Sequence, residues 1–396
     1  MLNPSEKWSC SPNLGEHITY HRGALIESRI FKERVKRATI LMKEAGLDAI
    51  LLTKPQNMMY LVGDGRLCAF TIVSKEGATY VGVPKTDLED VEKSCASEHI
   101  LGFEDEVGML HSLMHIWKEL GLEKGKVGVE NTFLKVSMLE MFKHPHAKPP
   151  RLEFADATPI MTELRIIKSS EEIELIRKTA KVADIAMDAA IKATKPGIAE
   201  TEIAAEAEYT MRKNGAEEFY RTYVASGSRS SIAHGLVSHR KMQEGDLVVI
   251  DLHPTVNAYH ADLCRTICVG KPSEKQRKAF EVYLEAQRAA VEAVCPGSTM
   301  TKLENLMHEI FEREGYEEYF IGPPIHGVGL EFEEPPLPAG HAFFHGEEPK
   351  DELKPGMVIS IGNCGLYLGE FGVRVEDTVV VTDRGHEELT SYCRML

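Results

Sequence analysis

The stretch VVIDLHPTVNAYHADLCRT, residues 248–266, constrains the fold more than any other part of the chain. A β-branched run ends at Asp251, a polar turn at Asn257 and Ala258 follows, and Asp262 comes eleven residues after the first acid. Side chains alternate across a strand, so the pattern predicts a β-hairpin that brings both carboxylates to one site. Two carboxylates in a poorly solvated site repel each other, and a divalent cation removes that repulsion. Two surface acids at strand ends remain the alternative.

Length and composition indicate a cytoplasmic protein of two or three globular domains. The 396 residues, of which 43% are apolar, can fill large cores. A formal charge of −15 argues against binding to nucleic acid or to anionic membranes. The sequence has no apolar run long enough to span a membrane, and its polar N-terminus lacks a signal-peptide core. Its eight scattered cysteines fit reduced thiols better than a disulfide framework.

The first part of the chain has the alternating pattern of a small α/β domain, predicted over residues 1–155. An irregular arm is expected over about the first 25 residues. Residues 29–53 have the pattern of an amphipathic helix followed by a strand, and residues 111–130 repeat that order. Proline and histidine mark the domain boundary within residues 143–159. Short strands or loop–strand pieces are expected at QNMMYLVG, CAFTIVS and ATYVGVP.

The second part, residues 160–396, predicts an α+β domain in which helices cover one side of antiparallel strands. Ser169 to Glu172 have the residues of a helix N-terminus, with acids in the first turn. Further helices are predicted at ETEIAAEAEYTMRKNG, EKQRKAFEVYLEAQRAAVEAVCPG and TKLENLMHEIFEREG. Strands are predicted at YVASG, LVVIDLHP, ADLCRTICVG, MVISIGNCG and RVEDTVVVT.

Three further motifs carry groups that could join the two aspartates. PPIHGVGLEFEEPPLP places His326 beside glycines, which let a backbone approach a ligand closely. FGVRVEDTVVVT places Arg374 and Glu376 on one face of a strand and Asp377 on the other. SIAHGLVSH places His234 ahead of the first strand of the hairpin. Taken singly, each motif also fits an ordinary structural role, such as a loop hydrogen bond or a strand-edge ion pair.

Together, and in this order, the motifs resemble those of the creatinase, prolidase and aminopeptidase P family, to which methionine aminopeptidase is also related. The resemblance implies a C-terminal pita-bread fold and a smaller N-terminal domain like that of creatinase and prolidase. Methionine aminopeptidase lacks that N-terminal domain. The resemblance runs from about Glu163 to Thr382 and rests on ELRIIKSSEEIELIRKTAKVAD, GD.VVIDL, Y.AD..RT, HGVGLE..EPP, LKPGMV.SI and VRVEDTVVVT.

The resemblance also implies a set of metal ligands. In the peptidases of this family, two aspartates, one histidine and two glutamates bind two divalent ions. The matching motifs imply that four of these ligands are Asp251, Asp262, His326 and Glu376. A further family histidine, which assists proton transfer, matches His234.

The chain departs from the family pattern at three positions. The family has Ser/Thr-Ile-Glu-Pro after PGMV, whereas PGMVISIGNCG places Gly362 or Asn363 where the first glutamate belongs. A second family histidine is replaced by Glu333, and a glycine by His253, which alternation puts on the same face as Asp251. His253, Glu333 or a water could replace the missing ligand, and the expected metal is Mn, Fe, Zn or Co rather than Mg or Ca. Two ions, one ion and none remain open.

The first hypothesis for function is a metal-dependent hydrolase of a C–N bond in a small substrate, with Xaa-Pro peptides as the default that the resemblance implies. Either His234 or Glu333 would move protons. A creatinase-like or ectoine-hydrolase-like enzyme is the first alternative, and a lyase that cleaves dimethylsulfoniopropionate is the second. A third alternative is a family member that has lost catalysis, but the retained metal ligands argue against it.

A local resemblance to creatinase assigns a role to Arg66. Gly65-Arg66 is similar to a creatinase Gly-Arg that binds the substrate carboxylate, a task that suits a planar guanidinium. In the family this arginine reaches the active site of a neighbouring subunit, which implies a homodimer. A solvated loop arginine remains the alternative for Arg66.

Overall fold

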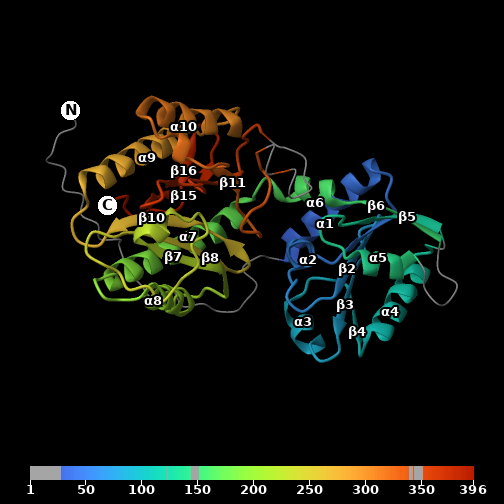
Figure 1. The fold of residues 1–396 in the computed structure, drawn as a ribbon. Coiled ribbons are helices and arrows are strands. Elements are labelled where there is room, and N and C mark those ends of the chain that lie inside the picture. The colour runs from blue at the N-terminus through green and yellow to red at the C-terminus, as the bar shows by residue number, and fades with distance from the viewer. Residues whose placement is uncertain (1–27, 123, 144–150, 339–341, 343–350) are drawn as a thin grey trace. The chain divides into compact units, whose positions relative to one another are not determined.

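The computed structural model describes residues 28–122, 124–143, 151–338, 342 and 351–396 (Figure 1). The predicted irregular arm lies outside the described residues. The described chain forms two compact units that divide between Ile166 and Ile167. The sequence places this boundary at 155–160, whereas helix α6 (Thr158–Arg165) packs on helix α1 (Ser28–Glu44) of the first unit.

The N-terminal unit is a mixed six-stranded sheet with helices between its strands, as the alternating pattern predicts. The strand order is β4-β3-β2-β1-β5-β6, and both antiparallel and parallel neighbours occur. Its strands are β1 (Ala49–Leu52), β2 (Phe70–Ser74), β3 (Thr79–Pro84), β4 (His99–Phe103), β5 (Lys124–Val129) and β6 (Arg151–Asp156). Its other helices are α2 (Pro55–Val62), α3 (Leu88–Ser94), α4 (Glu106–Glu119) and α5 (Val136–Lys143).

The expectation of a strand or loop at QNMMYLVG is wrong, because this segment lies in helix α2. Pro55 occupies the first turn, where its missing N–H costs nothing, and Gly63 ends the helix in the left-handed conformation at φ 82°. So short an apolar run has no clear period, and therefore its composition does not distinguish a buried helix from a buried strand. The proline at the start of this segment and the glycine at its end identify it as a helix.

The C-terminal unit is built on an eight-stranded sheet. Its main path is β11-β12-β15-β10-β8-β7, while β9 pairs with β8 and β16 pairs with β15. The strands are β7 (Glu218–Ser226), β8 (Leu247–Val256), β9 (Tyr259–His260), β10 (Leu263–Cys268), β11 (Ile325–Gly327), β12 (Val358–Ile361), β15 (Glu376–Val381) and β16 (His386–Glu388), with β13 (Leu366–Tyr367) and β14 (Gly372–Val373) pairing separately. The helices are α7 (Ser170–Ala193), α8 (Glu200–Lys213), α9 (Glu274–Glu292) and α10 (Met300–Glu314).

Strand alternation separates an apolar face of this sheet from a polar one. Helix α7 begins at a capping box formed by Ser169 and Glu172, and with α8 it packs on the apolar face. Val248, Ile250 and Leu252 of β8 belong to that core. The residues between and after them, including Asp251, therefore point to the other face.

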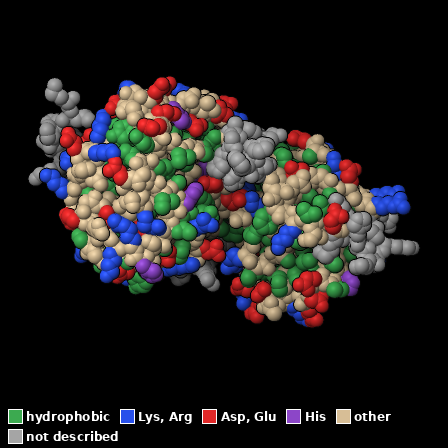
Figure 2. All heavy atoms as spheres, viewed as in Figure 1, with side chains coloured by type: hydrophobic (Ala, Val, Ile, Leu, Met, Phe, Trp, Pro, Cys, Tyr) green, Lys and Arg blue, Asp and Glu red, His purple; other side chains and the backbone are tan. Residues whose placement is uncertain are grey.

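On the face drawn in Figure 2, acidic and basic side chains are interspersed. Among the described residues, no helix is long and apolar enough to cross a membrane. The seven cysteines that the structure describes are free.

Candidate metal centre

The predicted hairpin is confirmed, and it brings Asp251, His253 and Asp262 together. Strands β8 and β10 pair antiparallel, and the chain reverses through Asn257 and Ala258, both left-handed at φ 50° and 68°. The same alternation that buries the neighbouring apolar residues turns Asp251 and His253 to one face. The carboxylate of Asp262 reaches that face from the start of β10.

One cluster of ligand-type atoms surrounds the His253 ring. Its Nε2 lies 3.2 Å from Asp251 Oδ1 and 3.4 Å from Asp262 Oδ1. Its Nδ1 lies 2.6 Å from the carbonyl oxygen of Arg221, which can only accept, so Nδ1 carries a proton. All three side chains of the cluster are buried.

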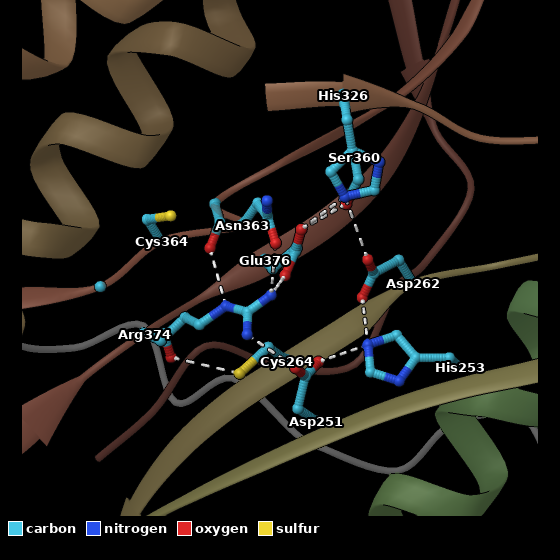
Figure 3. Close-up of polar contacts among 12 residues, drawn as sticks. Asp251, His253, Asp262, Cys264, His326, Ser360, Asn363, Cys364, Arg374 and Glu376 are labelled. Carbon is cyan, nitrogen blue, oxygen red and sulfur yellow. Dashed lines mark hydrogen bonds and ion pairs between the residues drawn. The ribbon is translucent and has the colours of Figure 1, made fainter. Parts of the chain in front are cut away.

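A second cluster surrounds His326 on β11. Its Nε2 lies 3.5 Å from Asp262 Oδ2 and 3.6 Å from Glu376 Oε1. Its Nδ1 lies 3.0 Å from the carbonyl oxygen of Gly327, again leaving Nε2 to face the acids. Ser360 donates to Glu376 Oε1 at 2.8 Å. Asp262 thus contributes one oxygen to each cluster, as Figure 3 shows.

Five of the six facing atoms of the two clusters are buried and lack hydrogen-bond partners, the exception being Glu376 Oε1. Within the described chain this holds for Asp251 Oδ1, His253 Nε2, both Asp262 carboxylate oxygens and His326 Nε2. Buried polar atoms are nearly always hydrogen-bonded, so a converging group of exceptions indicates that another species satisfies them. Carboxylate oxygens and imidazole nitrogens are common ligands of divalent ions, and these residues fit such an ion.

Arg374 contacts the carboxylate oxygens of Asp251 and Glu376 that do not face the histidines. Its guanidinium donates to Asp251 Oδ2 at 2.7 Å and pairs with Glu376 Oε2. It also donates to the carbonyl oxygen of Gly362 at 3.0 Å and to the side-chain oxygen of Asn363 at 3.2 Å (Figure 3). The predicted shared face of Arg374 and Glu376 is confirmed, but the contact with Asp251 makes this pair part of the centre rather than an isolated strand-edge pair.

The charges of the centre shift the pKa values of its members. Burial works to raise the pKa of Asp251, but the nearby charges of Arg374 and His253 lower it. Burial and the charge of Glu376 raise the pKa of Asp262. Burial works to lower the pKa of His253, but Asp251 and Asp262 raise it to about 9. Without a metal, protons on the ring partly neutralise the acids, and metal binding displaces such protons.

Gly362 is one of the two residues predicted to stand where the family pattern has a glutamate, and the backbone leaves no room for a side chain there. Its φ is +119°, which L-residues rarely adopt. A Cβ at this position would lie 2.0 Å from the carbonyl oxygen of Val375 and 2.8 Å from Cα of Glu376. Position 362 therefore excludes a carboxylate side chain through its backbone packing as well as through its residue type.

The other predicted site residues differ in their relation to this centre. The exposed His234 lies near enough to lower the pKa of Asp251, and its ring is 5.9 Å from that of Tyr223. Burial works to lower the pKa of His326, but Asp262, Glu376 and then the half-buried Glu333 raise it. Arg66 lies in the N-terminal unit, where its half-exposed guanidinium donates to Asp64 at 2.8 Å.

Two aromatic residues beside the centre were not predicted from the sequence. Tyr220 stacks on Phe332 at 4.7 Å between ring centroids, and Phe332 packs edge-on against His253 at 4.5 Å. Tyr220 is 48% exposed, so the stack runs from the imidazole to solvent. The sequence held one indication that Phe332 lies at the site, because it directly precedes the predicted site residue Glu333.

A buried ion pair positions the loop that carries Phe332 and Glu333. Lys168 Nζ lies 2.8 Å from Glu334 Oε1, and both side chains are at most 2% exposed. We expect Lys168→Met to lower the free energy of unfolding by about 3–5 kcal/mol, because it removes the buried cation that pairs with the Glu334 carboxylate. Urea denaturation of metal-free protein measures this loss. The control Lys93→Met breaks an exposed pair with Glu89 and should cost less than about 1 kcal/mol, and equal losses would contradict the assignment.

Comparisons with known proteins agree with these observations. Residues 174–383 match metallopeptidase family M24, and residues 34–167 match the creatinase/prolidase N-terminal domain. The Xaa-Pro dipeptidases of Pyrococcus furiosus and Pyrococcus horikoshii are 39% and 36% identical to this chain, over 92% and 93% of it and 99% of each relative. The solved prolidase of Pyrococcus furiosus is similar with a TM-score of 0.78 at 38% identity, covering 90% of this chain and 100% of the other. The Xaa-Pro dipeptidase of Bacillus anthracis has a TM-score of 0.81 at 29% identity, covering 92% and 99%.

Proposed function

The chain belongs to metallopeptidase family M24, and we propose that it hydrolyses the peptide bond of Xaa-Pro dipeptides at a divalent-metal centre. The observation that carries the proposal is the group of buried, unpartnered oxygen and nitrogen atoms of Asp251, His253, Asp262 and His326. The similarity to two Xaa-Pro dipeptidases over nearly the whole chain supports the choice of substrate.

We assign Asp251, Asp262, His326 and Glu376 as residues that hold the metal, which we expect to be Mn, Fe, Zn or Co. When bound, a divalent ion supplies Lewis acidity, which lowers the pKa of water and polarises a carbonyl group. Arg374 lowers the pKa of Asp251, and its contacts orient the carboxylates of Asp251 and Glu376.

The groups around the metal ligands receive the remaining roles. Two residues exchange protons with the nucleophile and the leaving amine. They are His234, which is exposed and close to Asp251, and Glu333, whose charge raises the pKa of His326. The stack of Tyr220 and Phe332 offers an apolar surface to the pyrrolidine ring. In the proposed homodimer, Arg66 binds the dipeptide carboxylate in the neighbouring subunit. The free cysteines support a cytoplasmic location.

A substrate panel tests the proposal. We expect turnover of Ala-Pro at least about a hundredfold faster than of Pro-Ala, creatine, ectoine or dimethylsulfoniopropionate, a difference of about 2.7 kcal/mol in transition-state binding. Proline release, measured with ninhydrin, reports the peptidase reaction. Turnover of creatine or ectoine alone would replace the peptidase by a small-molecule hydrolase, and an alkene product would indicate a lyase. Absence of turnover throughout the panel, with metal present, would reject the proposal.

A further inference from the structure

We infer that His253 is itself a metal ligand and that it replaces, from strand β8, a ligand that the end of β12 no longer supplies. The inference rests on the proposed function, because it assigns a ligand within the same centre. It implies two ion positions that share Asp262. Asp251, His253 and Asp262 bound the first, and Asp262, His326 and Glu376 bound the second.

The imidazole of His253 is held in the state that a metal ligand requires. Its Nδ1 donates to the carbonyl oxygen of Arg221, so Nε2 is the nitrogen that can offer a lone pair. That nitrogen is fully buried and aimed at Asp251 and Asp262 without meeting the geometry of a hydrogen bond. His326 shows the same arrangement, with Nδ1 on the carbonyl oxygen of Gly327 and Nε2 toward two acids.

The distances between each histidine Nε2 and the facing carboxylate oxygens fit atoms that bind one common ion. Two ligand atoms at about 2.1 Å from a tetrahedral ion are separated by about 3.4 Å. Nε2 of His253 is 3.2 Å and 3.4 Å from the two aspartate oxygens. Nε2 of His326 is 3.5 Å and 3.6 Å from its two acids. The distances in the first cluster therefore fit a metal ion at least as closely as those in the second cluster.

The surroundings explain why the ligand comes from position 253. A side chain at Gly362 would collide with the backbone of Val375, so position 362, just after β12, cannot supply a carboxylate in this conformation. Phe332 and Tyr223 pack edge-on against the His253 ring, at 4.5 Å and 5.8 Å between centroids, and limit its rotation. Replacing an anionic ligand by a neutral imidazole also shifts preference from Mg toward Zn or Co.

Metal titration of the whole protein tests the inference. Chelator-treated wild type, His253→Gln and the control His308→Gln are titrated with ZnCl₂ and with CoCl₂ by calorimetry, and bound metal is counted after dialysis. His308 lies on helix α10 and contacts Glu317 at the surface, so its loss leaves the centre intact. We expect two ions per chain for wild type and for His308→Gln. We expect His253→Gln to bind one ion normally and the other at least tenfold more weakly.

A second variant guards against a folding defect. His253→Gly, which empties the ring position, should recover the weakened ion when imidazole is added, and His308→Gly should show no effect of imidazole. Two ions of wild-type affinity in His253→Gln, or no imidazole effect in His253→Gly, would overturn the role of His253 while the peptidase proposal stands. A wild-type protein that binds no ion would overturn both.

Discussion

Replacing Asp262 by alanine should abolish tight metal binding and lower kcat/KM for Ala-Pro at least about a thousandfold, equal to about 4 kcal/mol of transition-state stabilisation. The reason is that Asp262 alone contributes an oxygen to each of the two clusters. Losing it removes a ligand and a negative charge from both ion positions at once. Elemental analysis after dialysis, together with Ala-Pro kinetics, measures both effects.

The matched control for this variant is Asp188→Ala. Asp188 pairs with the exposed Lys192 on helix α7 and accepts from the hydroxyl of Tyr392, and it belongs to neither cluster of ligand-type atoms. It should retain wild-type metal content and activity. Full metal occupancy in Asp262→Ala would show that the ligand assignment is wrong.

Replacing Arg374 by methionine should destabilise the metal-free protein by about 3–5 kcal/mol. Arg374 is almost fully buried and pairs with Asp251 and Glu376, so its loss leaves two buried carboxylates without their cation. Saturating Zn²⁺ should recover part of this loss, because an ion bound only to the folded state stabilises it and supplies positive charge. Urea denaturation with chelator and then with Zn²⁺ measures the two values.

Arg313→Met serves as the control for Arg374→Met. Arg313 pairs with Glu285 and Glu314 at the surface with about half of its side chain exposed, so the variant should lose less than about 1 kcal/mol in either buffer. A loss in Arg374→Met that is equally small would mean that the buried pairs are energetically unimportant. A large loss that Zn²⁺ leaves unchanged would separate Arg374 from the metal centre.

The core of the site could be predicted because local rules determine it. Alternation along β8 places Asp251 and His253 on one face, and the turn at Asn257 returns the chain to Asp262. These three residues lie within one short hairpin, so no knowledge of the distant chain is needed. The approach of His326 and Glu376 required the resemblance to a known family, because strand order in the sheet does not follow from local pattern.

The features that were missed depend on contacts between distant segments. The contact of Arg374 with Asp251 joins residues 123 positions apart. The exclusion of a side chain at Gly362 depends on how β12 packs against the start of β15, whereas the sequence shows only that the acid is missing. Tyr220 and Phe332 come from different segments, and their stacking depends on tertiary packing rather than on any periodicity.

The most direct test of the account is a crystal structure of the protein grown with ZnCl₂, with anomalous diffraction recorded on both sides of the zinc absorption edge. The central claim predicts an anomalous peak at about 2.0–2.2 Å from an Asp262 oxygen and from the Nε2 atom of His326. The role of His253 adds a second peak between its Nε2 and Asp251. An anomalous map without a peak beside Asp262 at full zinc saturation would contradict the metal centre.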